Sequence, residues 1–250
     1  MKKLLSVLLA VVCILSLAAC ASSQPQSATE AETAGDSNTP VTGGWTLNSS
    51  DAATLPKDVQ TAFDKATEAI TGGRYVPVAY LGSQVVAGMN YALLCELLPA
   101  TTPSPASVED TSPFSLKVLI IYSDLGGKAE ITNVADFDLA KYTQDGGKTQ
   151  TELLSGGWSA PEELSSAPID DGAKAAFSKA MENFEGNNLD LMALLGTQVV
   201  SGTNYAFLCR STPVTPDAAS SIQVVTVYED LDKNATIFNI CRLDVADFNS

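Results

Sequence analysis

Two segments of the chain carry the same alternation of apolar and polar positions. In each, an apolar run leads into the short sequence Gln-Val-Val-x-Gly, and a second apolar run follows it. Residues two apart along a strand point to the same face of a sheet, so these runs fit β-strands. The pattern therefore predicts, twice, a pair of antiparallel strands joined by a hairpin. The runs are residues 75–81 and 91–98 in the first copy and residues 189–195 and 205–209 in the second.

The tip of each hairpin has an unusual composition. Hairpin tips are normally built from polar pairs such as Asn-Gly, whereas residues 84–88 and 198–202 carry two adjacent valines and one closing glycine. Apolar side chains exposed at a turn gain nothing from water, which suggests a partner that covers them. The alternative is that the valines belong to the strands and lie in the core. Spacing alone leaves both interpretations open.

An amphipathic helix is predicted before each hairpin. Val59, Phe63 and Ala66 recur at spacings of four and three, which places them on one face of a helix. Ala173 and Phe177 begin the same stripe in the second copy. Glycines follow both stripes and are typical of helix ends.

One helix followed by an antiparallel meander can bury its stripe only against one face of the sheet. The predicted fold class is therefore α+β, with two tandem domains, each one long helix packed on a four- to five-stranded antiparallel sheet. The alternation of Tyr91, Leu93 and Cys95 supports this arrangement. Ala92 and Leu94 make the opposite face apolar as well, so the pattern is not a simple one.

Internal repetition sets the predicted domain boundaries. Beyond the hairpins, Val-Leu-Ile-Ile-Tyr at residues 118–122 matches Val-Val-Thr-Val-Tyr at residues 224–228. Two domains of a common size follow, at residues 43–140 and 156–250. The polar stretch at residues 141–155 is the predicted linker.

The first 42 residues predict export and a membrane anchor. Residues 1–19 combine two lysines, a short apolar run and small residues before Cys20, which describes a secretory signal peptide too short to span a membrane. The cleavage region resembles the lipobox of bacterial lipoproteins, which implies acylation of Cys20 and a location on the extracytoplasmic face of the cell membrane. An ordinary secretory signal is the alternative. Residues 20–42 contain no aromatic residue and are predicted to be a flexible tether.

Composition narrows the possible functions. The chain has 14 Lys and Arg against 29 Asp and Glu, and this acidic balance disfavours nucleic acid as a partner. The absence of histidine excludes His-dependent triads and imidazole zinc sites. Without histidine, catalysis would need a carboxylate pair or a Ser-Lys arrangement, so the chain is predicted not to be an enzyme. No cofactor or metal is predicted, and Cys95, Cys209 and Cys241 form a poor disulfide framework.

Each copy resembles the cystatins, and among them the stefins most closely, which inhibit papain-like cysteine proteases. The resemblance rests on Gln-x-Val-x-Gly in a hairpin, followed by Asn-Tyr, after a single helix and an upstream glycine. Gly44 lies 40 residues before Gln84, and Gly157 lies 41 residues before Gln198. The resemblance covers residues 43–248.

The resemblance implies a wedge that plugs a protease cleft. An N-terminal trunk and two hairpin tips line up along one edge, and Val41 or Leu154 would enter the pocket that reads substrate side chains. The residues implied in protease contact are Gly44, Gln84, Val85, Val86, Ala87, Gly88, Leu125 and Gly126 in the first copy and Gly157, Gln198, Val199, Val200, Ser201 and Gly202 in the second. Two linked copies could then engage two protease molecules or gain avidity on an oligomeric target.

The chain departs from the family in its second hairpin. Neither copy has the Pro-Trp pair of many secreted cystatins, and residues 230–233 of the second copy are more charged than a dry contact favours. That loop of the second copy is therefore not among the predicted contact residues. The alternative function is a non-inhibitory cystatin-like binding module on the cell surface, because fold does not determine function.

Overall fold

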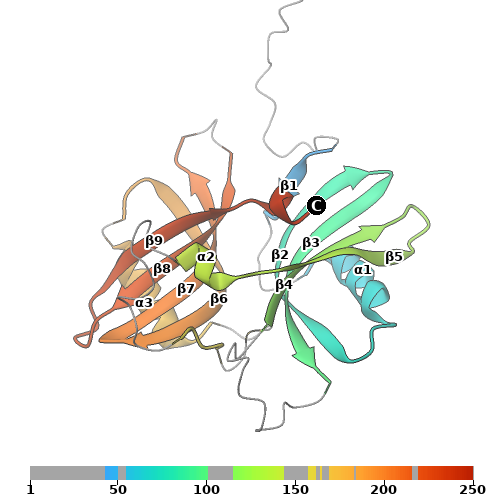
Figure 1. Ribbon diagram of the computed structural model, residues 1–250. Helices are drawn as coiled ribbons and strands as arrows, with labels where there is room; N and C mark the ends of the chain where they lie inside the picture. Colours follow the sequence, from blue (N-terminus) through green and yellow to red (C-terminus); the bar gives the residue numbers. More distant parts are fainter. Residues whose placement is uncertain are drawn as a thin grey trace, which may run out of the picture. The chain divides into compact units, whose positions relative to one another are not determined.

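The computed structural model describes residues 43–49, 55–100, 115–143, 157–161, 164, 169–182, 184–215 and 219–249, all of which belong to one compact unit (Figure 1). We call residues 43–143 the first half and residues 157–249 the second half. The first half contains β1 (Trp45–Leu47), α1 (Lys57–Thr67), β2 (Gly73–Val86), β3 (Gly88–Pro99), β4 (Ser115–Ser123), β5 (Ala129–Asp136) and α2 (Leu139–Thr143). The second half contains α3 (Asp171–Met181), β6 (Asn187–Val200), β7 (Gly202–Pro213), β8 (Ser221–Glu229), β9 (Ala235–Leu243) and the 3-10 helix η2 (Val245–Phe248).

The strands form two antiparallel meanders. The first sheet has the order β1-β2-β3-β4-β5, and the second has the order β6-β7-β8-β9. The β2–β3 hairpin closes at the pair Val86 and Gly88, and the β6–β7 hairpin closes in the same way at Val200 and Gly202. Both register shifts of the first hairpin recur at equivalent places in the second. The two halves therefore repeat in register as well as in sequence.

One face of each sheet is covered by its helix. Val59 and Phe63 of α1 are buried in a cluster with Leu93 and Ile121 of the sheet. In the second half, Phe177 of α3 packs in the equivalent cluster, with its ring edge-on to that of Phe207 at a centroid distance of 5.2 Å. The apolar stripes that periodicity predicts thus lie where a helix and a sheet meet.

The opposite faces of the two sheets share a single hydrophobic core. Ala92 and Leu94 of β3 belong to one buried cluster with Ala206 and Leu208 of β7. These residues alternate along their strands with the ones that face the helices. The second apolar face noted in the sequence is therefore buried against the other half of the chain.

The segments that follow β5 and β9 each contact the opposite half. Asn239 Nδ2 of β9 donates a hydrogen bond to the Tyr142 carbonyl oxygen of α2 at 2.9 Å. Reciprocally, Asn133 Nδ2 of β5 donates to the Phe248 carbonyl oxygen of η2 at 2.7 Å. Phe137 stacks on the Tyr142 ring at 4.9 Å and lies 6.4 Å from the ring of Phe248. These two hydrogen bonds join the halves at equivalent places of the repeat.

The α+β prediction of two helix-on-sheet domains is wrong. The structure is 53% strand and only 19% helical, and its helices are short, with eleven residues each in α1 and α3. Since each sheet buries its second face in the shared core, neither half is a separate helix-on-sheet layer. Periodicity reports that a face is apolar but does not report what covers it. The domain boundaries stay a prediction, and the predicted linker begins within α2.

Candidate functional site

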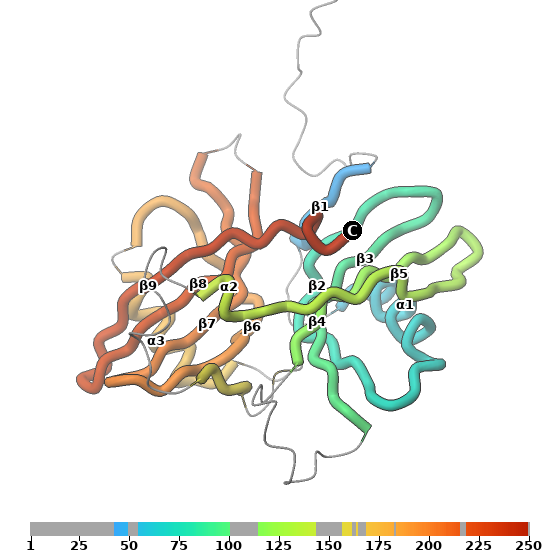
Figure 2. The backbone as a smooth tube through the Cα atoms, in the orientation of Figure 1, coloured from blue at the N-terminus to red at the C-terminus, as the bar shows by residue number. Residues whose placement is uncertain are grey.

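Three segments of the first half meet at one end of its sheet (Figure 2). Trp45 of β1 pairs with Gln84 of β2, which places Gly44 beside the β2–β3 hairpin. Met89, just after the hairpin tip, pairs with Ser123 at the end of β4, where the second hairpin begins. We call this end, with Gly44, Val85–Gly88 and Leu125–Gly126, the first tip edge. Gly157, Val199–Gly202 and Leu231 occupy the equivalent places in the second half, the second tip edge.

The glutamine of the motif is a structural residue. Gln84 Oε1 accepts a hydrogen bond from Asn90 Nδ2 across the hairpin at 2.8 Å, and its Nε2 donates to the Gly43 carbonyl oxygen at 2.9 Å. The Gly43 N–H in turn donates to the Val85 carbonyl oxygen at 3.3 Å. Gln198 accepts from Asn204 in the same way at 2.9 Å. The Gln–Asn pair therefore braces each hairpin, and in the first half it also attaches the lead-in chain.

The closing glycine is required by the strand beside it. Gly88 has φ +143°, a region that side-chain-bearing residues rarely adopt, and a Cβ there would clash with the Ser123 carbonyl oxygen. Gly202 has φ +130°, and its Cβ would clash with the Glu229 carbonyl oxygen. Both glycines let the hairpin approach the neighbouring strand closely.

A tyrosine on the neighbouring strand, β4 or β8, holds each hairpin tip. Tyr122 Oη donates to the Ala87 carbonyl oxygen at 2.7 Å, and Tyr228 Oη donates to the Ser201 carbonyl oxygen at 2.7 Å. Both bonds fix the one residue that stands between the two strands of the hairpin. Sequence reasoning missed these tyrosines, although both close matching apolar runs of the repeat.

Apolar side chains are exposed on both tip edges. Val86 is 39% exposed and Val199 is 72% exposed, whereas Val85 and Val200 are half-buried. Leu125 at the second hairpin of the first half is 92% exposed, and Gly126 beside it is exposed. The interpretation that all four valines are core residues therefore fails.

Leu231 is the residue that sequence reasoning left out. It stands at the place of Leu125 and is 81% exposed. The signal was available, because Asp-Leu opens both turns, but the acidic and basic neighbours of Leu231 concealed it.

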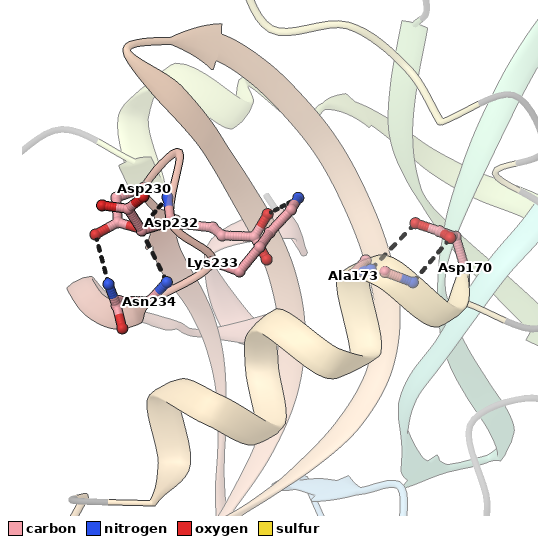
Figure 3. A network of polar contacts seen from close by, with 8 residues as sticks. Asp170, Ala173, Asp230, Asp232, Lys233 and Asn234 are labelled. Carbon is pink, nitrogen blue, oxygen red and sulfur yellow. Dashed lines mark hydrogen bonds and ion pairs between the residues drawn. The ribbon is translucent and has the colours of Figure 1, made fainter.

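The charged side chains around Leu231 form hydrogen bonds within their own turn (Figure 3). Asp230 accepts hydrogen bonds from the Asn234 N–H at 2.9 Å, from Asn234 Nδ2 at 3.0 Å and from the Asp232 N–H at 2.8 Å. These bonds, those from Asn234 foremost, lower the pKa of the Asp230 carboxyl. Lys233 Nζ bonds to Glu229 at 2.7 Å, and this bond raises the pKa of the Lys233 ammonium. The charges of the loop thus build the turn that presents Leu231.

The residue after the motif, Tyr91, ties the first hairpin to its helix. Its phenol donates to Asp58 Oδ2 at 3.2 Å at the start of α1. Burial, with the Asp58 charge second, raises the pKa of Tyr91 to about 12. The ring also packs edge-on to Tyr80 at 6.4 Å. This tyrosine is therefore a structural residue.

The cysteines of the described residues are all free thiols. Cys95 and Cys209 are buried, and burial raises the pKa of both, which disfavours the reactive thiolate. Cys209 lies on β7 and Cys241 on β9, with β8 between them. Within the described ranges, no group of three or more His, Cys, Asp or Glu residues could hold a metal ion.

Several predicted features lie outside the described residues. These are Cys20, the signal peptide, the tether, and the trunk positions Val41 and Leu154. Among the helices that the structure describes, none is long and apolar enough to cross a membrane.

Comparison with known protein families finds no match to this sequence, and comparison with curated proteins finds no relative.

Proposed function

We propose that this protein inhibits papain-like cysteine proteases by inserting a tip edge into the substrate cleft. The observation that carries the proposal is the meeting of three segments at one end of a sheet: a lead-in glycine, a valine-bearing hairpin and a leucine-bearing hairpin. These are the three parts that the resemblance to cystatins implies. Catalysis is not required of such a protein, and its partner is the protease.

Rigidity of the tip edge supports this function. Binding costs less when the contact segments are ordered before the partner arrives. The hairpin tip is fixed by the Tyr122 hydroxyl, the Gln84–Asn90 pair and the close approach at Gly88. Val86 and Leu125 extend from this frame into solvent. The cost of exposing these side chains to water is recovered only when a partner covers them.

The test is inhibition of papain by the chain that begins at Ala21. We expect stoichiometric inhibition, and we expect Val86→Asp combined with Val199→Asp to raise the inhibition constant at least tenfold, because each aspartate would have to be desolvated in the cleft. The matched control is Val134→Asp, since Val134 is 42% exposed but lies on β5 away from the tips.

Two results would count against inhibition. Wild-type chain with an intact fold that leaves papain fully active at micromolar concentration would exclude this function and favour the alternative binding module. Equal loss in the tip variant and in Val134→Asp would show that the effect is not specific to the tips.

We also propose that acylated Cys20 anchors the protein to the extracytoplasmic face of the cell membrane. The support is the lipobox-like sequence that ends at Cys20. We expect Cys20→Ser to move the protein from the membrane fraction to the soluble fraction. Retention of the variant in the membrane fraction would exclude lipid anchoring at this residue.

A further inference from the structure

The two tip edges face away from each other. Arg210 lies on β7 far from the second tip, and its Nη1 donates a hydrogen bond to the Asn48 carbonyl oxygen at 3.4 Å. The Asn48 N–H in turn donates to the carbonyl oxygen of Leu81 on β2, which is five residues before Val86 and thus in the tip half of the first sheet. Conversely, Leu139 follows the end of β5 that is remote from the first tip. The Leu139 side chain packs against Gly196, with its Cδ2 3.0 Å from the position that a Cβ of Gly196 would occupy. Gly196 is four residues before Val200 and thus in the tip half of the second sheet. The tip half of each sheet therefore lies beside the opposite end of the other sheet.

The second tip edge has all the parts of the first. Thr203, just after the β6–β7 tip, pairs with Glu229 as Met89 pairs with Ser123. Gly157 precedes the bridge between Ser159 and Thr197, so the lead-in chain reaches this sheet too. Val199 and Leu231 supply the exposed apolar side chains.

We infer that one chain holds two protease molecules at the same time, one on each tip edge, an inference that rests on the proposed function. Each contact of standard size covers about 800 Å² of the inhibitor. Because the edges face opposite directions, a protease on one edge leaves the other accessible. The two sites are joined through the buried core that both sheets share.

The experiment counts protease molecules per chain. Papain of known active-site concentration is titrated with the chain from Ala21, and the mass of the complex with alkylated papain is measured by light scattering after gel filtration. We expect two papain molecules per wild-type chain. Val86→Asp with Leu125→Asp should leave one, and Val199→Asp with Leu231→Asp should also leave one. The four-fold variant should bind none, and Val134→Asp should still bind two.

The outcomes separate this inference from the proposed function. One papain per wild-type chain, abolished by one pair of substitutions and unaffected by the other, would overturn the inference and leave inhibition standing. No inhibition by any form would remove the proposed function itself. The mass of the wild-type complex decides the stoichiometry even where a variant loses its fold, which circular dichroism would reveal.

Discussion

The two tip edges are built on the same frame but are held differently. In the first half, β1 pairs with β2 as far as Gln84, and Gly43 bonds to the loop itself. In the second half, the described lead-in residues pair with β6 only at the bridge between Ser159 and Thr197. Val85 is half-buried, whereas its equivalent Val199 is 72% exposed. The next valine shows the reverse order, because Val86 is 39% exposed and its equivalent Val200 is half-buried. The two edges therefore expose different valines of the same motif.

This difference shows what the repeated motif encodes. The glutamine and the glycine, together with the asparagine and tyrosine that follow, have structural roles that are common to both halves: a cross-strand amide pair, a close backbone approach and a ring packed in the cluster beneath the helix. The valines are the positions whose exposure differs. Because the valines are also identical in the two copies, identity alone does not separate structural residues from contact residues, and exposure identifies the side chains available to a partner.

The largest expected loss of stability comes from substitution of the closing glycines of the two hairpins. We expect Gly88→Ala and Gly202→Ala each to lower the free energy of unfolding by about 2–5 kcal/mol, because both strain the backbone and force it away from the neighbouring strand. Urea denaturation measures this change. Equal losses would show that the two hairpins respond equally, and a smaller loss at Gly202 would show that the second hairpin relaxes more readily than the first.

Gly157→Ala is the control for these variants. No described residue lies within 4 Å of the Cβ it would add, and its backbone is not in the left-handed region. We expect its stability to stay within about 0.5 kcal/mol of wild type, as for most surface substitutions. A loss as large as that of Gly88→Ala would mean that strain at the hairpin is not the cause.

The hairpins could be predicted from sequence because their signal is local. Alternation and a closing glycine are sufficient to place both strands and the tip, and a spacing of three and four residues is sufficient to place Val59 and Phe63 against the sheet. The prediction failed where the partner is distant in the chain. Ala92 and Leu94 showed a second apolar face, but no periodicity states that residues more than 100 positions away cover it.

The candidate site, like the fold, was predicted only in part. The motif identified both hairpin tips, and the repeat identified their equivalence. Leu231 was missed because Asp230 and Lys233 look like solvated charges when their turn bonds are unknown. The tyrosine braces were missed because a hydroxyl bond across strands depends on register, which the sequence does not state.

The next effect tests the reciprocal contacts between the halves. Asn133→Ala and Asn239→Ala each remove a hydrogen bond to a carbonyl oxygen of the other half, which is worth about 1 kcal/mol. We expect similar losses in thermal or urea unfolding, and a double variant that loses about 2 kcal/mol. If one substitution leaves stability unchanged while the other lowers it, the two contacts between the halves do not contribute equally to stability.

The smallest effect concerns the helix starts, where the halves differ. Asp170 caps α3 by accepting from the Gly172 and Ala173 N–H groups at 3.0 and 3.1 Å, whereas Pro56 at the start of α1 provides no side-chain cap (Figure 3). Losing such a cap costs about 1 kcal/mol. We therefore expect Asp170→Ala to destabilise the protein by that amount at neutral pH, as measured by urea denaturation.

The dependence of this loss on pH identifies its cause. The backbone N–H groups of Gly172 and Ala173 hold the pKa of Asp170 below its ordinary value. A carboxyl with a lowered pKa in the folded state contributes stability above its unfolded pKa, and that contribution disappears as pH falls through the folded pKa. The difference between Asp170→Ala and wild type should therefore shrink below about pH 4. Asp171→Ala is the control, because the Asp171 carboxylate lies 3.7 Å from Lys174 in an exposed pair worth less than about 1 kcal/mol. A difference for Asp170→Ala that stays constant from pH 7 to pH 2 would show that the ionised cap does not stabilise α3.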